Sequence, residues 1–113
     1  MRNMRGGYKA KYSSYRFRID WTSSEPFDPE NEMLDVKLQT CDGQEYMANF
    51  TTLKFLACVF EKNKRTGECA SGTYFCMPDN IVILEKLTEE DVRKTIDDLI
   101  ENEEVECYFK KTE

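Results

Sequence analysis

Glu68 and Asp79 are the two residues whose type and position could support acid–base chemistry. Both carboxylates lie in the stretch TGECASGTYFCMPDN, at the ends of expected elements and on loops that could be neighbours. One could then donate a proton and the other accept it. Two loop carboxylates do not define a pocket, however, and a helix end and a turn explain the glycines and the Pro-Asp pair. We favour this structural explanation, and a carboxylate-based enzyme remains an alternative.

The chain contains no histidine, which excludes Ser–His and Cys–His nucleophilic pairs and the commonest ligand of transition metals. It contains five cysteines, which are Cys41, Cys58, Cys69, Cys76 and Cys107. No two of them have C-x-x-C spacing, so we expect no structural zinc site. The glycines do not cluster as a phosphate-binding loop requires, and we expect no cofactor.

Composition indicates one globular domain, with 113 residues of which 40% are hydrophobic and 34% charged. The odd number of cysteines and the absence of an apolar run near the N-terminus favour free thiols in the reducing cytoplasm. No stretch approaches the ~18 apolar residues of a membrane span, so we expect no membrane partner.

The charges are unevenly distributed along the chain, whose formal net charge is −6. Residues 1–19 carry six bases and no acid, whereas the rest of the chain carries ten bases and all 22 acids. We interpret residues 1–13 as a flexible basic leader and residues 14–113 as a single acidic domain. Such a domain attracts basic partners and repels nucleic acid.

The expected leader interleaves tyrosines with bases, a pattern that can stack nucleobases and neutralise phosphates. The candidate nucleic-acid contacts are Arg2, Arg5, Lys9 and Lys11. The other explanation is a solvated tail, or one that lies across the protein's own acidic surface. The charge of the body favours this second explanation.

The stretch from Glu101 to Glu106 holds four acids and no base. Alternation along an expected strand places Glu104 and Glu106 on one side of it. Such an acidic edge either guards an edge strand against aggregation or docks a basic partner. The partner-binding residues that we expect are Glu68, Tyr74, Asp79, Glu101, Glu103 and Glu104.

Hydrophobic periodicity predicts the order β-β-β-α-β-β-α-β. Alternation indicates strands over residues 15–21, 33–40, 44–50 and 104–110, the last with Val105, Cys107 and Phe109 inward. GTYFCM and NIVILE indicate two more strands, joined by a tight turn at Pro78-Asp79. Because Ile81-Val82-Ile83-Leu84 does not alternate, we expect it in the sheet interior with both faces covered. A three-residue turn at Cys41-Asp42-Gly43 keeps the apolar faces of the second and third strands together.

Helices are predicted over residues 51–68 and 88–101. The first has Thr51 or Thr52 as N-cap and Gly67 at its end, and the second has Thr88 as N-cap. Their apolar stripes are Leu53, Leu56, Ala57, Val59 and Phe60 in the first, and Val92, Ile96, Leu99 and Ile100 in the second. We therefore expect an α+β domain with an antiparallel or mixed sheet of about six strands and two helices packed on one face.

Two stretches, DGQEYMANFTTLKFL and KNKRTGECASGTYFCMPDNIVILEKLTEEDVRKTIDDLIENEEVECYF, resemble a family of small hypothetical bacterial proteins. The shared features are D-G-x-x-Y-x-A-x-F-x-T, T-G-E-C-x-x-G-x-Y-F, an aspartate before a β-branched strand and a final helix. The resemblance covers about residues 34–109 and omits the leader. It implies a bacterial or phage setting and no particular chemistry, and Cys76 departs from it where members often have Trp.

We therefore expect a small cytoplasmic protein-binding module and not an enzyme. Its most specific version is an immunity protein or an inhibitor that neutralises a basic partner protein. The alternatives are a nucleic-acid-associated protein that uses the basic leader and an enzyme that uses carboxylates.

Overall fold

The structure is a computed structural model that describes residues 4–21, 28–76 and 80–112. Its elements, in chain order, are α1 (Met4–Lys11), β1 (Arg16–Ile19), β2 (Met33–Gln39), β3 (Glu45–Thr52), α2 (Leu53–Thr66), α3 (Glu68–Gly72), β4 (Ile81–Leu84), α4 (Glu89–Glu101), α5 (Val105–Tyr108) and β5 (Lys110–Lys111). The α+β class is confirmed, with five strands in the described residues where we expected about six.

The sheet is mixed and has β3 at its centre. β1, β2 and β3 pair antiparallel in sequence order, whereas β4 runs parallel to β3 on the side away from β2. The short β5 pairs antiparallel with the start of β3 on that same side. The predicted turn is confirmed, since Thr40 N donates to Gln44 O at 2.9 Å and Gly43 has a φ of +91°.

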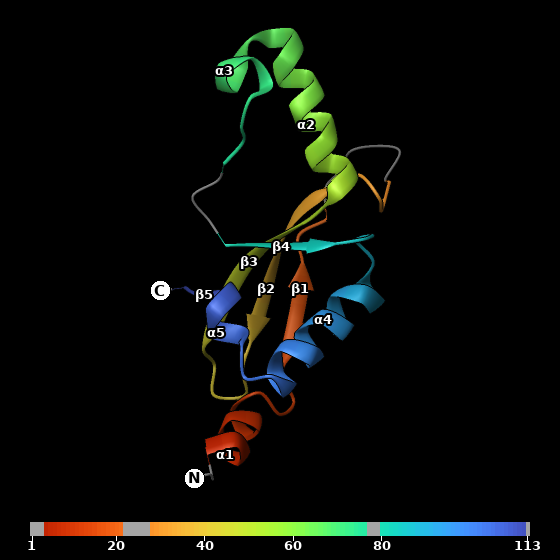
Figure 1. Ribbon diagram of the computed structural model, residues 1–113. Helices are drawn as coiled ribbons and strands as arrows, with labels where there is room; N and C mark the ends of the chain where they lie inside the picture. Colours follow the sequence, from red (N-terminus) through yellow and green to blue (C-terminus); the bar gives the residue numbers. More distant parts are fainter. Residues whose placement is uncertain (1–3, 22–27, 77–79, 113) are drawn as a thin grey trace.

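One face of the sheet carries the core, and α4 lies across it (Figure 1). Alternation along β2 and β3 buries one set of side chains, and α4 contributes Val92 and Ile96, both fully buried. The predicted start of this helix is confirmed, because Thr88 Oγ1 accepts a hydrogen bond from Asp91 N at 3.1 Å. The sheet residues of the core are Ile19, Leu34, Val36, Leu38, Tyr46, Ala48, Phe50 and Leu84.

The strand predicted over residues 104–110 is wrong except at Lys110, which begins β5. α5 is a single helical turn, closed by Phe109 N donating to Val105 O at 2.7 Å. Val105 and Phe109 are buried as expected, because residues four apart share a face in both a strand and a helix. Cys107 would share the buried face of Val105 and Phe109 in a strand but not in a helix. It is exposed, as the helical turn requires.

The predictions around β4 also need correction. α3 ends at Gly72, and residues 73–76 contain no strand; the expected turn at Pro78-Asp79 lies outside the described residues. β4 is the outer strand of the order β1-β2-β3-β4, and Ile83 is 53% exposed. An apolar run without alternation therefore did not indicate a strand covered on both faces.

α2 begins and ends where the sequence predicts. Thr52 Oγ1 accepts a hydrogen bond from Phe55 N at 3.2 Å, and Gly67, with a φ of +87°, donates to Asn63 O at 2.8 Å. The helix does not pack on the sheet, however; it projects beyond it, and α3 folds back against it (Figure 1). We call residues 53–72 the arm.

The apolar stripe of α2 is only partly covered as a result. Leu53 is 67% exposed and Ala57 is exposed, whereas Leu56, Val59 and Phe60 are half-buried. The expectation of two helices on one face of the sheet is therefore wrong for α2. Helical spacing shows that a stripe needs a partner, but it does not show which surface provides it.

α3 returns along α2 through a left-handed turn. Cys69, Ala70 and Ser71 have φ between 52° and 57°, and Gly72 has a φ of +79°. Gly72 also lies against α2, since a Cβ atom there would come within 2.6 Å of Lys64 Cγ and 2.9 Å of the Phe60 carbonyl oxygen. The close approach of α3 to α2 therefore requires glycine at this position.

We expect Gly72→Ala to destabilise the arm by about 2–4 kcal/mol, because it adds backbone strain and a steric clash. Gly67→Ala is the matched control, since that glycine also has positive φ but nothing within 4 Å of its Cβ position. It should cost about 1 kcal/mol. Amide hydrogen exchange in α2 measures both losses, and equal losses would contradict the close-packing role of Gly72.

Candidate functional site

The segment before β1 belongs to the folded body, which corrects the interpretation of residues 1–13 as a flexible leader over the part that the structure describes. α1 packs beside α4, and the Tyr12 side chain is 2% exposed. Its ring lies 5.0 Å from that of Tyr8 and 6.2 Å from that of Tyr46, measured between centroids. The i, i+4 spacing of Tyr8 and Tyr12 is the helical signal that our sequence analysis missed.

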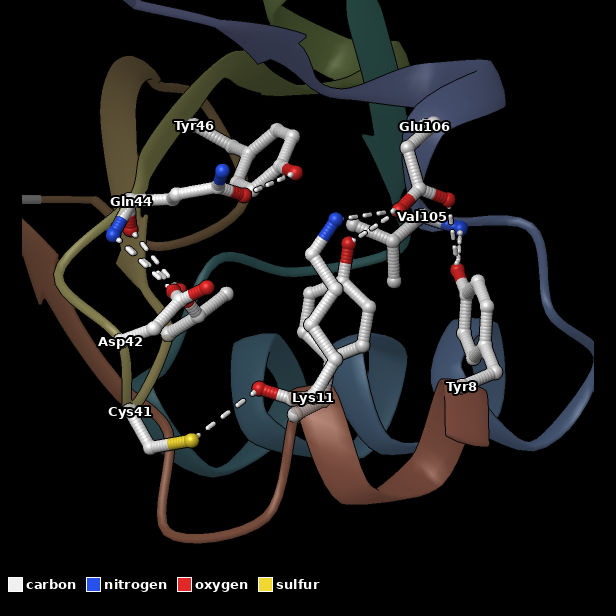
Figure 2. A network of polar contacts seen from close by, with 10 residues as sticks. Tyr8, Lys11, Cys41, Asp42, Gln44, Tyr46, Val105 and Glu106 are labelled. Carbon is white, nitrogen blue, oxygen red and sulfur yellow. Dashed lines mark hydrogen bonds and ion pairs between the residues drawn. The ribbon is translucent and has the colours of Figure 1, made fainter. Parts of the chain in front are cut away.

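Glu106 of α5 is the centre of a polar network with α1 (Figure 2). Tyr8 Oη donates to Glu106 Oε1 at 2.9 Å, and Tyr12 Oη donates to Oε2 at 2.5 Å. Lys11 Nζ lies 3.5 Å from the same Oε2. Tyr8 Oη also accepts a hydrogen bond from Val105 N at 2.8 Å, so the network connects α1 to both the backbone and the side chains of α5.

The network stabilises the ionised form of Glu106 and the protonated forms of the tyrosines. Burial alone would raise the pKa of Glu106, but the hydrogen bonds from Tyr12 and Tyr8 outweigh it and lower this pKa below its usual range. Burial raises the pKa of both phenols, and the negative charge of Glu106 raises it further. The network therefore has a structural role, and its carboxylate and phenols are not tuned to exchange protons at neutral pH.

The bases of the N-terminal segment pair with acids near the C-terminus. Lys9 Nζ lies 2.8 Å from Glu101 Oε1, and Lys11 pairs with Glu106. This arrangement agrees with the alternative in which the basic segment lies across the protein's own acidic surface. The other two candidate nucleic-acid contacts, Arg2 and the side chain of Arg5, lie outside the described part of the chain.

The two candidate acid–base residues do not form a described pair. Glu68 is exposed at the start of α3, where it accepts a hydrogen bond from Thr66 Oγ1 at 2.9 Å and lies 3.4 Å from Lys62 Nζ. These two contacts lower its pKa, which makes it a poor proton donor or acceptor at neutral pH. Asp79 lies outside the described residues.

The remaining partner-binding candidates lie on separate parts of the molecule. Tyr74, 52% exposed, follows the arm, whereas Glu101, Glu103 and Glu104 lie at the end of α4 beside α1 (Figure 1). Glu101 is exposed, and Glu103 and Glu104 are half-buried. Because no strand passes through residues 101–106, these acids do not guard a strand edge, and that explanation is wrong.

The surface that sequence analysis missed is the base of the arm together with β4. Leu53 directly follows Thr52, and Thr52 pairs with Leu84 at the end of β4. Leu53, and Ile83, which precedes Leu84 in β4, are the two most exposed of the large apolar side chains in the described residues. The sequence contained a signal for the projecting helix, because no loop residue separates the expected strand over residues 44–50 from the expected helix over residues 51–68. We did not recognise this signal.

A groove of about 490 Å³ opens between β4 and α4. Ile83 and Leu84 give it apolar walls, and Asp91 and Lys94 of α4 contribute charges on its other side. It lies next to the base of the arm because of the pairing of Leu84 with Thr52. Its mixture of apolar and charged side chains fits a contact surface.

All five cysteines are free thiols. Among residues 4–21, 28–76 and 80–112, no group of three or more Cys, Asp and Glu side chains is arranged to hold a metal ion. No helix of this part of the chain is long and apolar enough to cross a membrane.

Comparisons of the chain with protein-family models, with curated proteins and with solved structures find no match. The resemblance to a family of hypothetical bacterial proteins therefore stays a prediction.

We expect Tyr12→Phe to lower the free energy of unfolding by about 1.5–3 kcal/mol, because it removes a part-buried hydrogen bond to a charged group. Tyr108→Phe is the matched control, since Tyr108 is 44% exposed on α5, and it should change little. Urea unfolding measures both. An unchanged stability in Tyr12→Phe would contradict the structural role of the network.

Stability should also fall at alkaline pH. The raised pKa values of Tyr8 and Tyr12 contribute stability that is complete below their unfolded value of about 10 and is lost as pH rises through the folded values. The lowered pKa of Glu106 affects stability at acidic pH, where its contribution is lost as pH falls through the pKa of the folded state. Urea unfolding between pH 8 and about pH 11 should show the alkaline loss, and Tyr12→Phe should reduce its slope.

Proposed function

We propose that this chain is a protein-binding module without catalytic chemistry, and that the arm is its docking element. The observation that carries the proposal is the position of α2. It is a 14-residue helix with an apolar stripe, and it stands beyond the sheet with Leu53 67% exposed.

The energetics of an uncovered helix support this proposal. Helices in proteins obtain most of their stability from packing an apolar face, and α2 packs mainly against the short α3 and the end of β3. Each Å² of apolar surface left in water forgoes roughly 25 cal/mol. A partner that accepts the stripe in a groove would recover this free energy, which is the helix-in-groove mode of recognition.

The charge of the arm indicates the chemistry of the partner surface. The arm carries four bases and two acids, so its charge is opposite to that of the whole chain. Lys54, Lys64 and Arg65 are exposed beside the stripe. The arm therefore suits an apolar groove with an acidic rim.

The outward side of α4 is a second candidate surface, and it retains the proposal of a basic partner. Glu89, Glu90 and Asp98 are exposed there, away from the ion pairs with α1. An immunity protein or an inhibitor of a basic protein would use such a surface. The free thiols support a cytoplasmic location for this function.

A photo-activated cross-linking residue in place of Ala57 should join the chain to its partner in living cells. Ala57 is exposed on the arm, and the same residue in place of Tyr108 provides a control on α5. A third probe in place of Glu90 tests the acidic surface. Cross-linked products from position 57 but not from position 108 support the arm as the docking element. Products from position 90 alone transfer the docking role to α4. If no position gives a product, a protein-binding function is contradicted.

A further inference from the structure

β4 exposes an unpaired edge. Asn49 N donates to Asn80 O at 2.9 Å, so the backbone carbonyl of residue 80 faces β3. Because backbone groups alternate in direction along a strand, those of residues 82 and 84 also face β3. Ile81 and Ile83 then direct their N–H and C=O groups away from the sheet. No strand of the described residues lies on that side. Proteins commonly cover such an edge with a helix.

The groove between β4 and α4 lies where a covering helix would bind. Its apolar walls include Ile83, which is 53% exposed. The adjoining residues 85–101 carry seven acids and three bases. The groove therefore offers a small apolar contact at Ile83 and Leu84 within a segment of net negative charge, while its own lining carries two acids and two bases.

The groove and the arm are adjacent in each chain, because Thr52 at the base of the arm pairs with Leu84 in the groove. A two-fold axis beside this pair brings each arm to the groove of the other chain. Such an interface is self-complementary, since the same two surfaces meet twice. The two segments have net charges of opposite sign, since the arm carries four bases and two acids and residues 85–101 carry seven acids and three bases.

The size of this surface fits a weak dimer. Residues 53–60 of α2 and the seven residues that line the groove give about 15 residues a side. Stable interfaces use about 20–30 residues a side, so we expect this dimer to dissociate at low concentration.

We propose that the occupant of the arm is a second copy of this chain. Residues 53–60 of each α2 bind in the groove between β4 and α4 of the other copy and cover the edge of β4. This inference rests on the proposed docking function of the arm, and it adds the identity of the partner.

The test uses the purified full chain, with its mass in solution measured by sedimentation equilibrium over a range of concentrations. We expect a species of twice the 13.3 kDa chain mass. Leu53→Lys and Ile83→Lys should each weaken the dimer about tenfold or more, because they place a charge in an apolar contact. Ala57→Glu makes the same test on the exposed side of α2. Tyr108→Lys is the control at an exposed large side chain outside the proposed contact, and this variant should remain dimeric.

Cross-linking locates the contact. The probe at position 57, in the purified chain alone, should attach to residues 83–95 of a second copy, and high salt should reduce the yield. A dimer that survives Leu53→Lys, Ile83→Lys and Ala57→Glu, or a cross-link elsewhere, overturns the proposal. A monomer at all concentrations also overturns it. In that case a product between position 57 and a different protein in cells leaves the docking role of the arm intact, whereas no product in cells removes both.

Discussion

The direct junction between β3 and α2 is the constraint on which the rest of this structure depends. Thr52 is both the last residue of β3 and the N-cap of α2, so no loop separates the two elements. Its backbone pairs with Leu84, and its buried hydroxyl donates to Glu30 O at 2.6 Å while accepting from Phe55 N. A helix usually needs a connection of about 2–6 residues to fold back onto its sheet. Without one, α2 continues beyond the sheet, and the arm, the exposed stripe and the open edge of β4 follow from this.

The second organising contact joins the two ends of the described chain. The six bases among residues 1–19 and the acids around Glu106 look like separate charged tracts in the sequence. In the structure they meet, through Lys9 with Glu101 and through Lys11, Tyr8 and Tyr12 with Glu106. Two of the six bases are therefore paired with acids of this run, and Glu101 and Glu106 are less available to an external partner than the composition implies.

Local signals were sufficient to predict much of the fold. The turn at Gly43, the caps at Thr52 and Thr88 and the end of α2 at Gly67 depend on hydrogen bonds between residues close in sequence, and all four are confirmed. The errors arose where distant contacts decide. Residues 105–109 satisfy both helical and strand spacing for their buried pair, and the sequence alone did not indicate that Tyr12 would reach the core. The arm was missed because a stripe of apolar residues does not specify the surface that covers it.

The contact between Tyr12 and Glu106 also has a consequence for how the chain acquires its structure. The two residues are 94 positions apart, so their hydrogen bond closes most of the chain into one loop. The pairing of β2 with β3 spans far fewer residues and involves a smaller loss of loop entropy. Such local pairs form early, whereas contacts between distant residues form slowly. During synthesis on the ribosome, α1 is made well before α5 but cannot be held in its site until α5 has emerged. A helix that is synthesised early is thus among the last to be secured.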